Sequence, residues 1–152
     1  EIYGGSNGAS LVKGWAGVFE KNINLVPCST LDNVLGSRFY SKRCFIIVDI
    51  EGAEQWMLEG ASSVINMIPK PIWMMEISIS ENQPKGVSIN PNLLSTFKIF
   101  WDRGYAAWTA DKECRVIHPN EIEEIVKSGI DTFNTHNFLF IEKGKKCEWI
   151  EL

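Results

Sequence analysis

The sequence lacks the features that mark several large classes of protein. No apolar run approaches the ~20 residues that a membrane-spanning helix needs, so no spanning segment is predicted. The cysteines show no Cys-x-x-Cys spacing, which excludes the usual metal and redox motifs of that form. Reduced thiols in a cytoplasmic protein are the simplest interpretation. The cysteines are Cys28, Cys44, Cys114 and Cys147.

Basic residues are too few for a nucleic-acid-binding surface. Lys and Arg total 15 against 19 Asp and Glu, which gives a net charge of -4 and a pI of about 5.2. Binding to nucleic acid needs a clustered basic face that neutralises phosphates. The basic cluster at residues 143–146 fits a solvated tail better. Nucleic acid is therefore not an expected partner.

Neither an internal repeat nor a low-complexity tract divides the chain. Its 152 residues are 45% hydrophobic, which is enough to bury a core, and they fit a single domain. Residues 1–24 are predicted to be a loop-rich lead-in. Its glycines Gly4, Gly5 and Gly8 follow no predicted strand, so they are interpreted as a flexible surface loop and not as a cofactor-binding turn.

The most informative segment is residues 44–54, where a β-branched apolar run stops abruptly on acids and a glycine. Side chains alternate along an extended strand, so Asp49 and Glu51 are expected to point to the same side at its C-terminal end. In open α/β sheets, ligands bind beyond the C-terminal ends of the strands. The segment therefore predicts a buried strand that delivers carboxylates to a site.

The residues that follow predict a strand-helix-strand unit. Apolar residues recur at helical spacing after Gly52, and Pro69 and Pro71 are expected to stop that helix. A second apolar run, residues 72–79, carries Glu76 near its end. Two strands joined through a helix are parallel with a right-handed crossover, so Asp49, Glu51 and Glu76 are expected at the same edge of the sheet. The helical stripe comprises Ala53, Met57, Ala61, Val64, Ile65 and Ile68.

Further elements are predicted downstream. A helix opens at Asn90-Pro91 and ends at Gly104, and residues 105–108 form a short strand. A small helix follows, with Asn120 as its cap and Gly129 just past its end. Residues 138–141 form a buried closing strand.

Several segments together resemble the FkbM-like S-adenosylmethionine-dependent methyltransferases. Residues 48–61 read VDIEGAEQWMLEGA, a close match to the family signature Asp-Val-Glu-Gly-x-Glu-x-x-x-Leu-x-Gly-Ala in which only Ile50 replaces valine. Residues 25–35 (LVPCSTLDNVL) and 70–77 (KPIWMMEI) resemble the neighbouring family segments. Residues 97–105 resemble the family's helix ending in Gly-Tyr, and residues 136–141 resemble its closing strand. The resemblance covers residues 25–142.

The resemblance implies a Rossmann-like class I methyltransferase fold. Such a fold is α/β, with a mostly parallel sheet and an antiparallel closing strand. It also carries a Gly-rich turn after its first strand and a ribose-binding acid after its second, and neither is present in this chain. We therefore expect the chain to be the C-terminal portion of the domain, lacking the N-terminal strands, with a lead-in at 1–24 and a tail at 143–152.

The resemblance also implies a reaction: transfer of a methyl group from S-adenosylmethionine to a hydroxyl of a sugar, a glycan or a natural product. Asp49 and Glu76 would bind the cofactor, Asp49 contacting its methionyl end or the substrate. Glu51 or His136 would take the hydroxyl proton. No metal ligand set is predicted.

Each of these residues has a structural alternative. Asp49, Glu51 and Glu54 could cap the helix near Ala53, and His136 could be an ordinary hydrogen-bonded residue at a strand start. Glu76 would be costly to bury without a partner. Three tryptophans could line a ligand pocket, although such residues more often lie in a core. They are Trp73, Trp101 and Trp108.

Two other classes of function remain open. A metal-dependent enzyme would use Asp49, Glu51 and Glu76 as oxygen ligands for Mg²⁺ or Ca²⁺. A non-catalytic module would keep the fold and serve as a partner surface. Without upstream strands, the edge near residues 45–50 is expected to favour either self-association or a missing N-terminal half.

Overall fold

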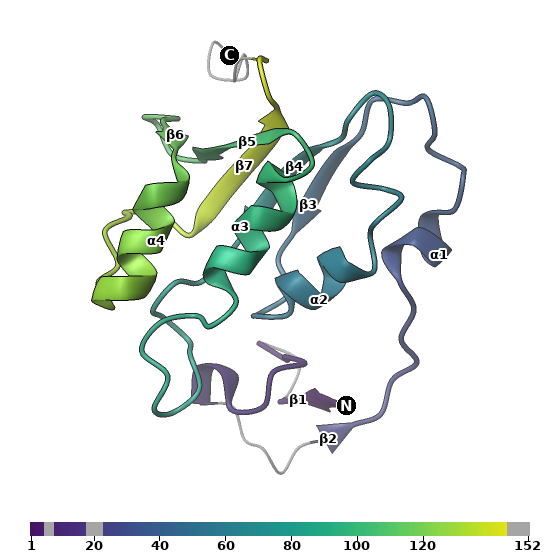
Figure 1. Ribbon diagram of the computed structural model, residues 1–152. Helices are drawn as coiled ribbons and strands as arrows, with labels where there is room; N and C mark the ends of the chain where they lie inside the picture. Colours follow the sequence, from purple (N-terminus) through teal and green to yellow (C-terminus); the bar gives the residue numbers. More distant parts are fainter. Residues whose placement is uncertain (5–7, 18–22, 146–152) are drawn as a thin grey trace.

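The computed structural model describes residues 1–4, 8–17 and 23–145. Gly5, Lys146 and Cys147 lie outside these ranges. The chain forms an α/β structure around a five-stranded mixed sheet with the strand order β3-β4-β7-β5-β6 (Figure 1). None of the helices in the described part of the chain has the length and apolar character that crossing a membrane requires.

The centre of the fold is the predicted strand-helix-strand unit. Strands β3 (Phe45–Val48) and β4 (Ile72–Glu76) are parallel, which confirms the expectation. Helix α2 (Glu54–Glu59) lies between them in the sequence. Strand β7 (Asn137–Glu142) runs antiparallel to β4, so the predicted antiparallel closing strand is also confirmed.

The helix after β3 is shorter than predicted, because it ends at Glu59 and not near Ile68. Gly60 follows it, and the carboxylate of Asp32 accepts the backbone N–H groups of Ser63 and Val64 at 2.9–3.1 Å. In a continuous helix these N–H groups would bond to carbonyls one turn earlier. A contact from a distant residue therefore replaces the second half of the predicted helix with turns.

Asp32 belongs to α1 (Leu31–Leu35), whose own N-cap is Thr30. Burial alone would raise the pKa of the Asp32 carboxyl, but hydrogen bonds from Ser63, Val64 and Ser62 outweigh it and hold the pKa below its usual range. The ionised carboxylate thus ties α1 to the turn that follows α2.

The downstream elements confirm the predicted order and correct some of its boundaries. Helix α3 (Leu93–Trp101) begins after Asn92, slightly later than the predicted opening. Strand β5 (Tyr105–Thr109) is present as predicted and pairs with both β7 and β6 (Val116–Ile117).

The predicted cap of the last helix was wrong. Helix α4 (Pro119–Ser128) starts with a proline, and its N-cap is His118, not Asn120. The backbone N–H of His118 donates to Glu121 Oε1 at 2.7 Å, which is one half of a capping box. Gly129 ends the helix in the left-handed conformation with φ 72°, as expected.

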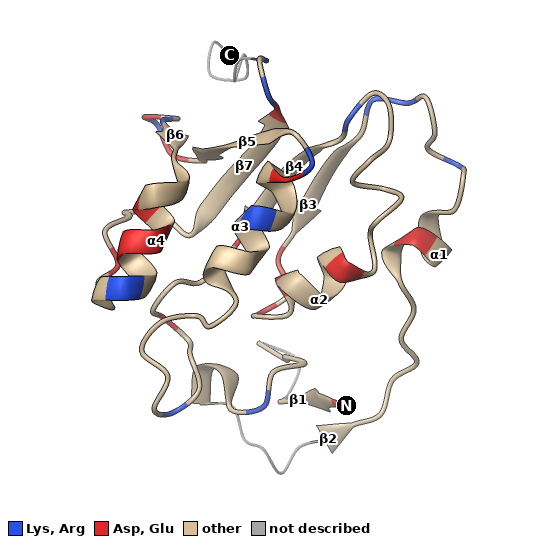
Figure 2. Ribbon diagram, viewed as in Figure 1, with Lys and Arg blue, Asp and Glu red and all other residues tan. Residues whose placement is uncertain are grey.

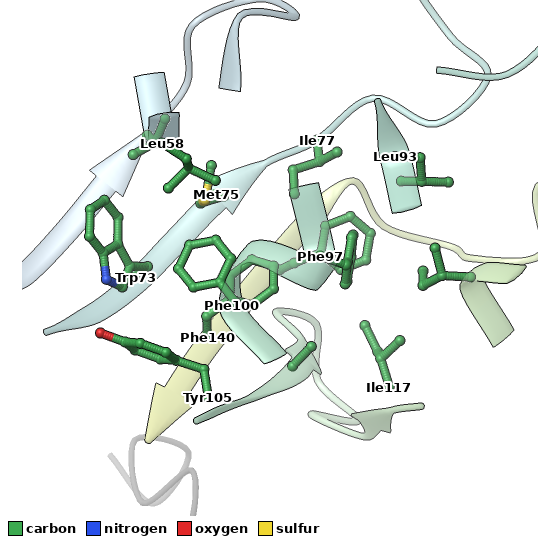
Figure 3. Close-up of a cluster of buried hydrophobic side chains, with 14 of the residues drawn as sticks. Leu58, Trp73, Met75, Ile77, Leu93, Phe97, Phe100, Tyr105, Ile117 and Phe140 are labelled. Atoms are coloured by element: carbon green, nitrogen blue, oxygen red, sulfur yellow. The ribbon is translucent and has the colours of Figure 1, made fainter. Parts of the chain in front are cut away.

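One face of the sheet carries the core. Trp73 and Met75 of β4 share this face with Phe138 and Phe140 of β7, and all four side chains are buried. Residues of α2, α3 and α4 pack against them, with the aromatic rings of Phe100 and Phe140 stacked 3.8 Å apart (Figure 3). The helical residues of this cluster are Leu58, Leu93, Phe97, Phe100, Ile122 and Ile125.

The opposite face of the sheet is much less covered. On β3, Phe45 and Ile47 point away from the core, with 53% and 64% of their surfaces exposed. Their neighbours on that face, Met74 and Leu139, are only partly buried. Among the described strands, β3 also forms one of the two edges of the sheet.

The N-terminal residues form a small unit of their own. Strands β1 (Ile2–Tyr3) and β2 (Ile23–Asn24) pair antiparallel, and a 3₁₀ turn, η1 (Trp15–Gly17), lies between them in the sequence. Figure 1 places this unit below the end of β3 and α2.

Candidate functional site

The acids of the signature converge in the turn between β3 and α2. After the buried Val48, the chain turns through Glu51 at φ 55° and Gly52 at φ 93°, both in the left-handed region. Figure 2 shows the acidic positions of this turn beside the start of α2. Glu51 therefore reaches the site through a turn, and not through the strand alternation that the sequence suggested.

A shallow depression lies where β3 and β4 end. It has about 160 Å³ of empty volume, part of which is open solvent. The expectation that Asp49, Glu51 and Glu76 meet at one edge of the sheet is confirmed, because all three line the depression. The full lining is Trp15, Asp49, Glu51, Gly52, Glu54, Glu76 and Ser78.

Glu54 is the most buried acid of this group, with 3% of its surface exposed. Its Oε1 accepts the backbone N–H of Gly52 at 2.9 Å, so it stabilises the turn as well as lining the depression. Burial raises the pKa of the Glu54 carboxyl, and the charges of Asp49 and Glu51 raise it further. Backbone hydrogen bonds only partly offset these effects.

Glu76 experiences the same negative surroundings. Burial raises the pKa of its carboxyl, Asp49 and Glu51 raise it further, and only His136 acts in the opposite direction. Among the residues that the structure describes, no Lys or Arg lines the depression. Carboxylates gathered without a counter-charge favour a proton or a positively charged ligand.

His136 is near this edge but does not line the depression. Its Nε2 lies 2.9 Å from Glu81 Oε2, and its backbone carbonyl accepts the N–H of Ile77 at 2.7 Å. The structure thus brings Asp49, Glu51 and Glu76 together and leaves His136 beside them, paired with a residue of the loop after β4.

The predicted flexible glycine loop is only partly at the surface in its described residues: Gly8 is partly exposed, with nothing within 4 Å of an added Cβ atom. Gly4 is buried, and Trp15 is only 3% exposed. Trp15 Nε1 donates to Glu51 Oε2 at 2.8 Å. The N-terminal segment therefore forms one wall of the depression.

The other tryptophans singled out by the sequence lie elsewhere. Trp73 is fully buried and makes an edge-on contact with Phe100 at 5.7 Å. Trp101 packs on Phe97 at 5.4 Å. None of Trp73, Trp101 and Trp108 lines the depression, so the core interpretation holds for Trp73.

The lining residues that were not predicted as site residues include Ser78 and Trp15. Ser78 could have been found, because it lies two positions after Glu76 and strand alternation puts both on one side. Trp15 gave no such signal, since its contact with Glu51 spans 36 residues and joins two separate elements.

Comparisons with known proteins add nothing to these observations. A comparison with models of protein families, with curated proteins and with solved structures found no match. Among the described residues, no three His, Cys, Asp or Glu side chains are arranged to hold a metal ion. The site is therefore defined by its geometry: converging carboxylates, one indole and a serine at the C-terminal edge of two parallel strands.

Proposed function

We propose that this chain forms part of an S-adenosylmethionine-dependent O-methyltransferase of the FkbM-like kind, with a Rossmann-like class I methyltransferase fold. Its acceptor would be a hydroxyl of a sugar, a glycan or a natural product. The observation that carries the proposal is the convergence of Asp49, Glu51 and Glu76 beyond the ends of β3 and β4. Ligands of open α/β sheets bind at this position.

The position of β7 adds support. The resemblance implied an antiparallel closing strand, and β7 runs antiparallel to both of its neighbours, β4 and β5. The signature residues 48–54 also form the end of a strand, a sharp turn and a helix start, which is the context a strand-end ligand site needs.

The described residues fit one end of the cofactor. S-adenosylmethionine carries positive charge on its sulfonium and amino groups, and the described residues that line the depression include carboxylates and no Lys or Arg. However, a site for a molecule of this size usually measures ~300–1,000 Å³. The depression, about 160 Å³ with open solvent included, is therefore too small to hold the whole cofactor.

In the proposed reaction, the bound cofactor supplies a methyl group activated by its sulfonium. Asp49 and Glu76 would bind the positively charged end, and Asp49 would also orient the acceptor. Glu51 would accept the proton of the acceptor hydroxyl, because it lines the depression. His136 is the alternative acceptor, although it would first have to leave Glu81.

A non-catalytic binding module is the second candidate. Two observations favour it, because both leave little room for a substrate. The depression is small, and the Trp15 ring occupies space beside the acids. A metal-dependent enzyme is not supported by the described residues, which present no metal-binding group of three.

The natural polypeptide that carries this chain tests the proposal. Calorimetry measures its binding of S-adenosylmethionine, and mass spectrometry follows formation of S-adenosylhomocysteine with a panel of monosaccharides and methyl glycosides. We expect binding, and turnover with at least one acceptor. A folded polypeptide that does not bind S-adenosylmethionine would contradict the proposal and favour the binding module.

A further inference from the structure

The N-terminal segment 8–17 is bonded directly to the acidic turn. Trp15 Nε1 donates to a carboxylate oxygen of Glu51 at 2.8 Å. Ser10 Oγ donates to the backbone carbonyl of the same residue at 2.6 Å. Ser10 and Trp15 are 1% and 3% exposed, so both donor side chains are buried, while Glu51 is partly exposed.

The fit between the segment and the turn is close. A Cβ atom on Gly52 would lie only 2.5 Å from the ring of Trp15, so the indole rests directly on the turn backbone. The next residue, Ala16, donates its N–H to the carbonyl of Asn82 at 2.7 Å. The segment therefore bridges the turn after β3 and the loop after β4.

This bridge restrains Glu51 in particular. A glutamate side chain normally loses substantial rotamer freedom when it is fixed, and Glu51 also has an unusual positive φ of 55°. A hydrogen bond from an indole to a carboxylate is charge-assisted and directional. It selects one orientation of the carboxylate, in which Glu51 lines the depression.

We propose that Trp15 is a positioning residue that holds the Glu51 carboxylate for proton transfer, with Ser10 holding the backbone of the same turn. This inference rests on the proposed methyltransferase function. Trp15 acts through Glu51, so its contribution disappears when Glu51 can no longer accept a proton.

A double-mutant cycle in the natural polypeptide tests the inference. Trp15→Phe keeps an aromatic ring against Gly52 and removes the N–H donor. We expect its turnover to fall about tenfold, while its affinity for S-adenosylmethionine stays within about twofold. Glu51→Gln lowers turnover further, and adding Trp15→Phe to it has no additional effect.

A control variant and a second test variant complete the experiment. Trp108→Phe removes an indole N–H that has no hydrogen-bond partner among the described residues, so turnover should not change. Ser10→Ala leaves the indole in place and should lower turnover about threefold, which keeps the test decisive if Trp15→Phe does not fold.

The Trp15 indole N–H resonance gives a readout that does not depend on activity. We expect Glu51→Gln to shift this resonance and to leave that of Trp108 in place. An unshifted Trp15 resonance, additive losses in the double mutant, or full turnover in Trp15→Phe would each overturn the inference. A wild type without turnover would contradict the methyltransferase proposal instead, and the resonance alone would then decide whether Trp15 fixes Glu51.

Discussion

At the scale of single residues, the acids of the depression differ in their surroundings. Asp49 is exposed and Glu51 is bonded to Trp15, whereas Glu54 is buried under the turn. Their roles can therefore be separated by substitutions that remove charge and keep shape.

Asp49→Asn is expected to lower methyl transfer by about 100-fold, because the charge is removed from the site while size and hydrogen bonding are kept. The free energy of unfolding should stay within about 0.5 kcal/mol, since Asp49 is exposed. Asp102→Asn, at the exposed end of α3, is the matched control. Unchanged methylation by a folded Asp49→Asn protein would remove Asp49 from the site.

Glu54→Gln is expected to stabilise the protein at neutral pH. A carboxyl with a raised pKa is harder to ionise in the folded state, so its charge destabilises the fold above the folded pKa. That cost vanishes when the pH is below the ordinary glutamate pKa of 4.5, because the Glu54 carboxyl is then protonated in both the folded and the unfolded state. The amide keeps an oxygen that can accept the N–H of Gly52.

Thermal unfolding at several pH values measures this effect. The melting temperature of Glu54→Gln should exceed that of the wild type at pH 7, and the difference should shrink as the pH falls toward 4. Glu59→Gln, on the exposed side of the same helix, should show no comparable gain. A Glu54→Gln protein that is less stable than the wild type at pH 7 would show that hydrogen bonds to the Glu54 carboxylate outweigh the cost of burying its charge.

At the scale of elements, the turn after β3 depends on one glycine. Gly52 has φ 93°, and a Cβ atom there would collide with the Trp15 ring. Both the backbone conformation and the packing of the N-terminal segment therefore require the absence of a side chain.

Gly52→Ala is expected to lower the free energy of unfolding by about 3 kcal/mol, combining backbone strain and overpacking. Gly86→Ala is a close control, because Gly86 has φ 89° but nothing within 4 Å of the added carbon. It should cost only about 1 kcal/mol. Denaturant unfolding compares the two, and equal losses would mean that the Trp15 contact contributes nothing.

At the scale of the whole molecule, the sheet is covered unevenly. The helices α2, α3 and α4 pack on one face, while Ile47 of the edge strand β3 is 64% exposed on the other. Strands of parallel sheets are normally buried on both faces. An open edge beside an apolar surface favours association with another chain.

The isolated chain of residues 1–152 is therefore expected to self-associate. Light scattering should give a mass above that of the 17.2 kDa monomer, rising with concentration. Ile47→Lys should shift the protein toward the monomer, whereas Val126→Lys, at an exposed position on α4, should not. A monodisperse wild-type monomer would show that this face is adequately covered.

The same isolated chain is expected to bind S-adenosylmethionine only weakly. Its depression is too small for the whole cofactor, and losing several polar contacts at ~1 kcal/mol each costs orders of magnitude in affinity. Calorimetry should give a dissociation constant above about 100 μM. Micromolar binding by residues 1–152 would mean that they hold the whole cofactor.

Much of the fold followed from local sequence. The apolar runs at β3 and β4, the crossover between them and the stop at Gly129 reflect strand alternation, chain connectivity and the freedom of glycine, which act over a few residues. Chain connectivity likewise put Asp49 and Glu76 at one edge of the sheet, whereas Glu51 reaches that edge through a turn that strand alternation does not predict.

Tertiary contacts decided the rest. The Asp32 carboxylate accepts the N–H groups that would have extended α2. Trp15 donates to Glu51, which lies 36 residues away in the sequence. Local periodicity predicts neither contact. The sequence by itself determined which strands carry the acids, because that depends on near neighbours along the chain. Only the tertiary structure decided how the acids are oriented and covered, because those contacts join segments that meet only when the chain has folded.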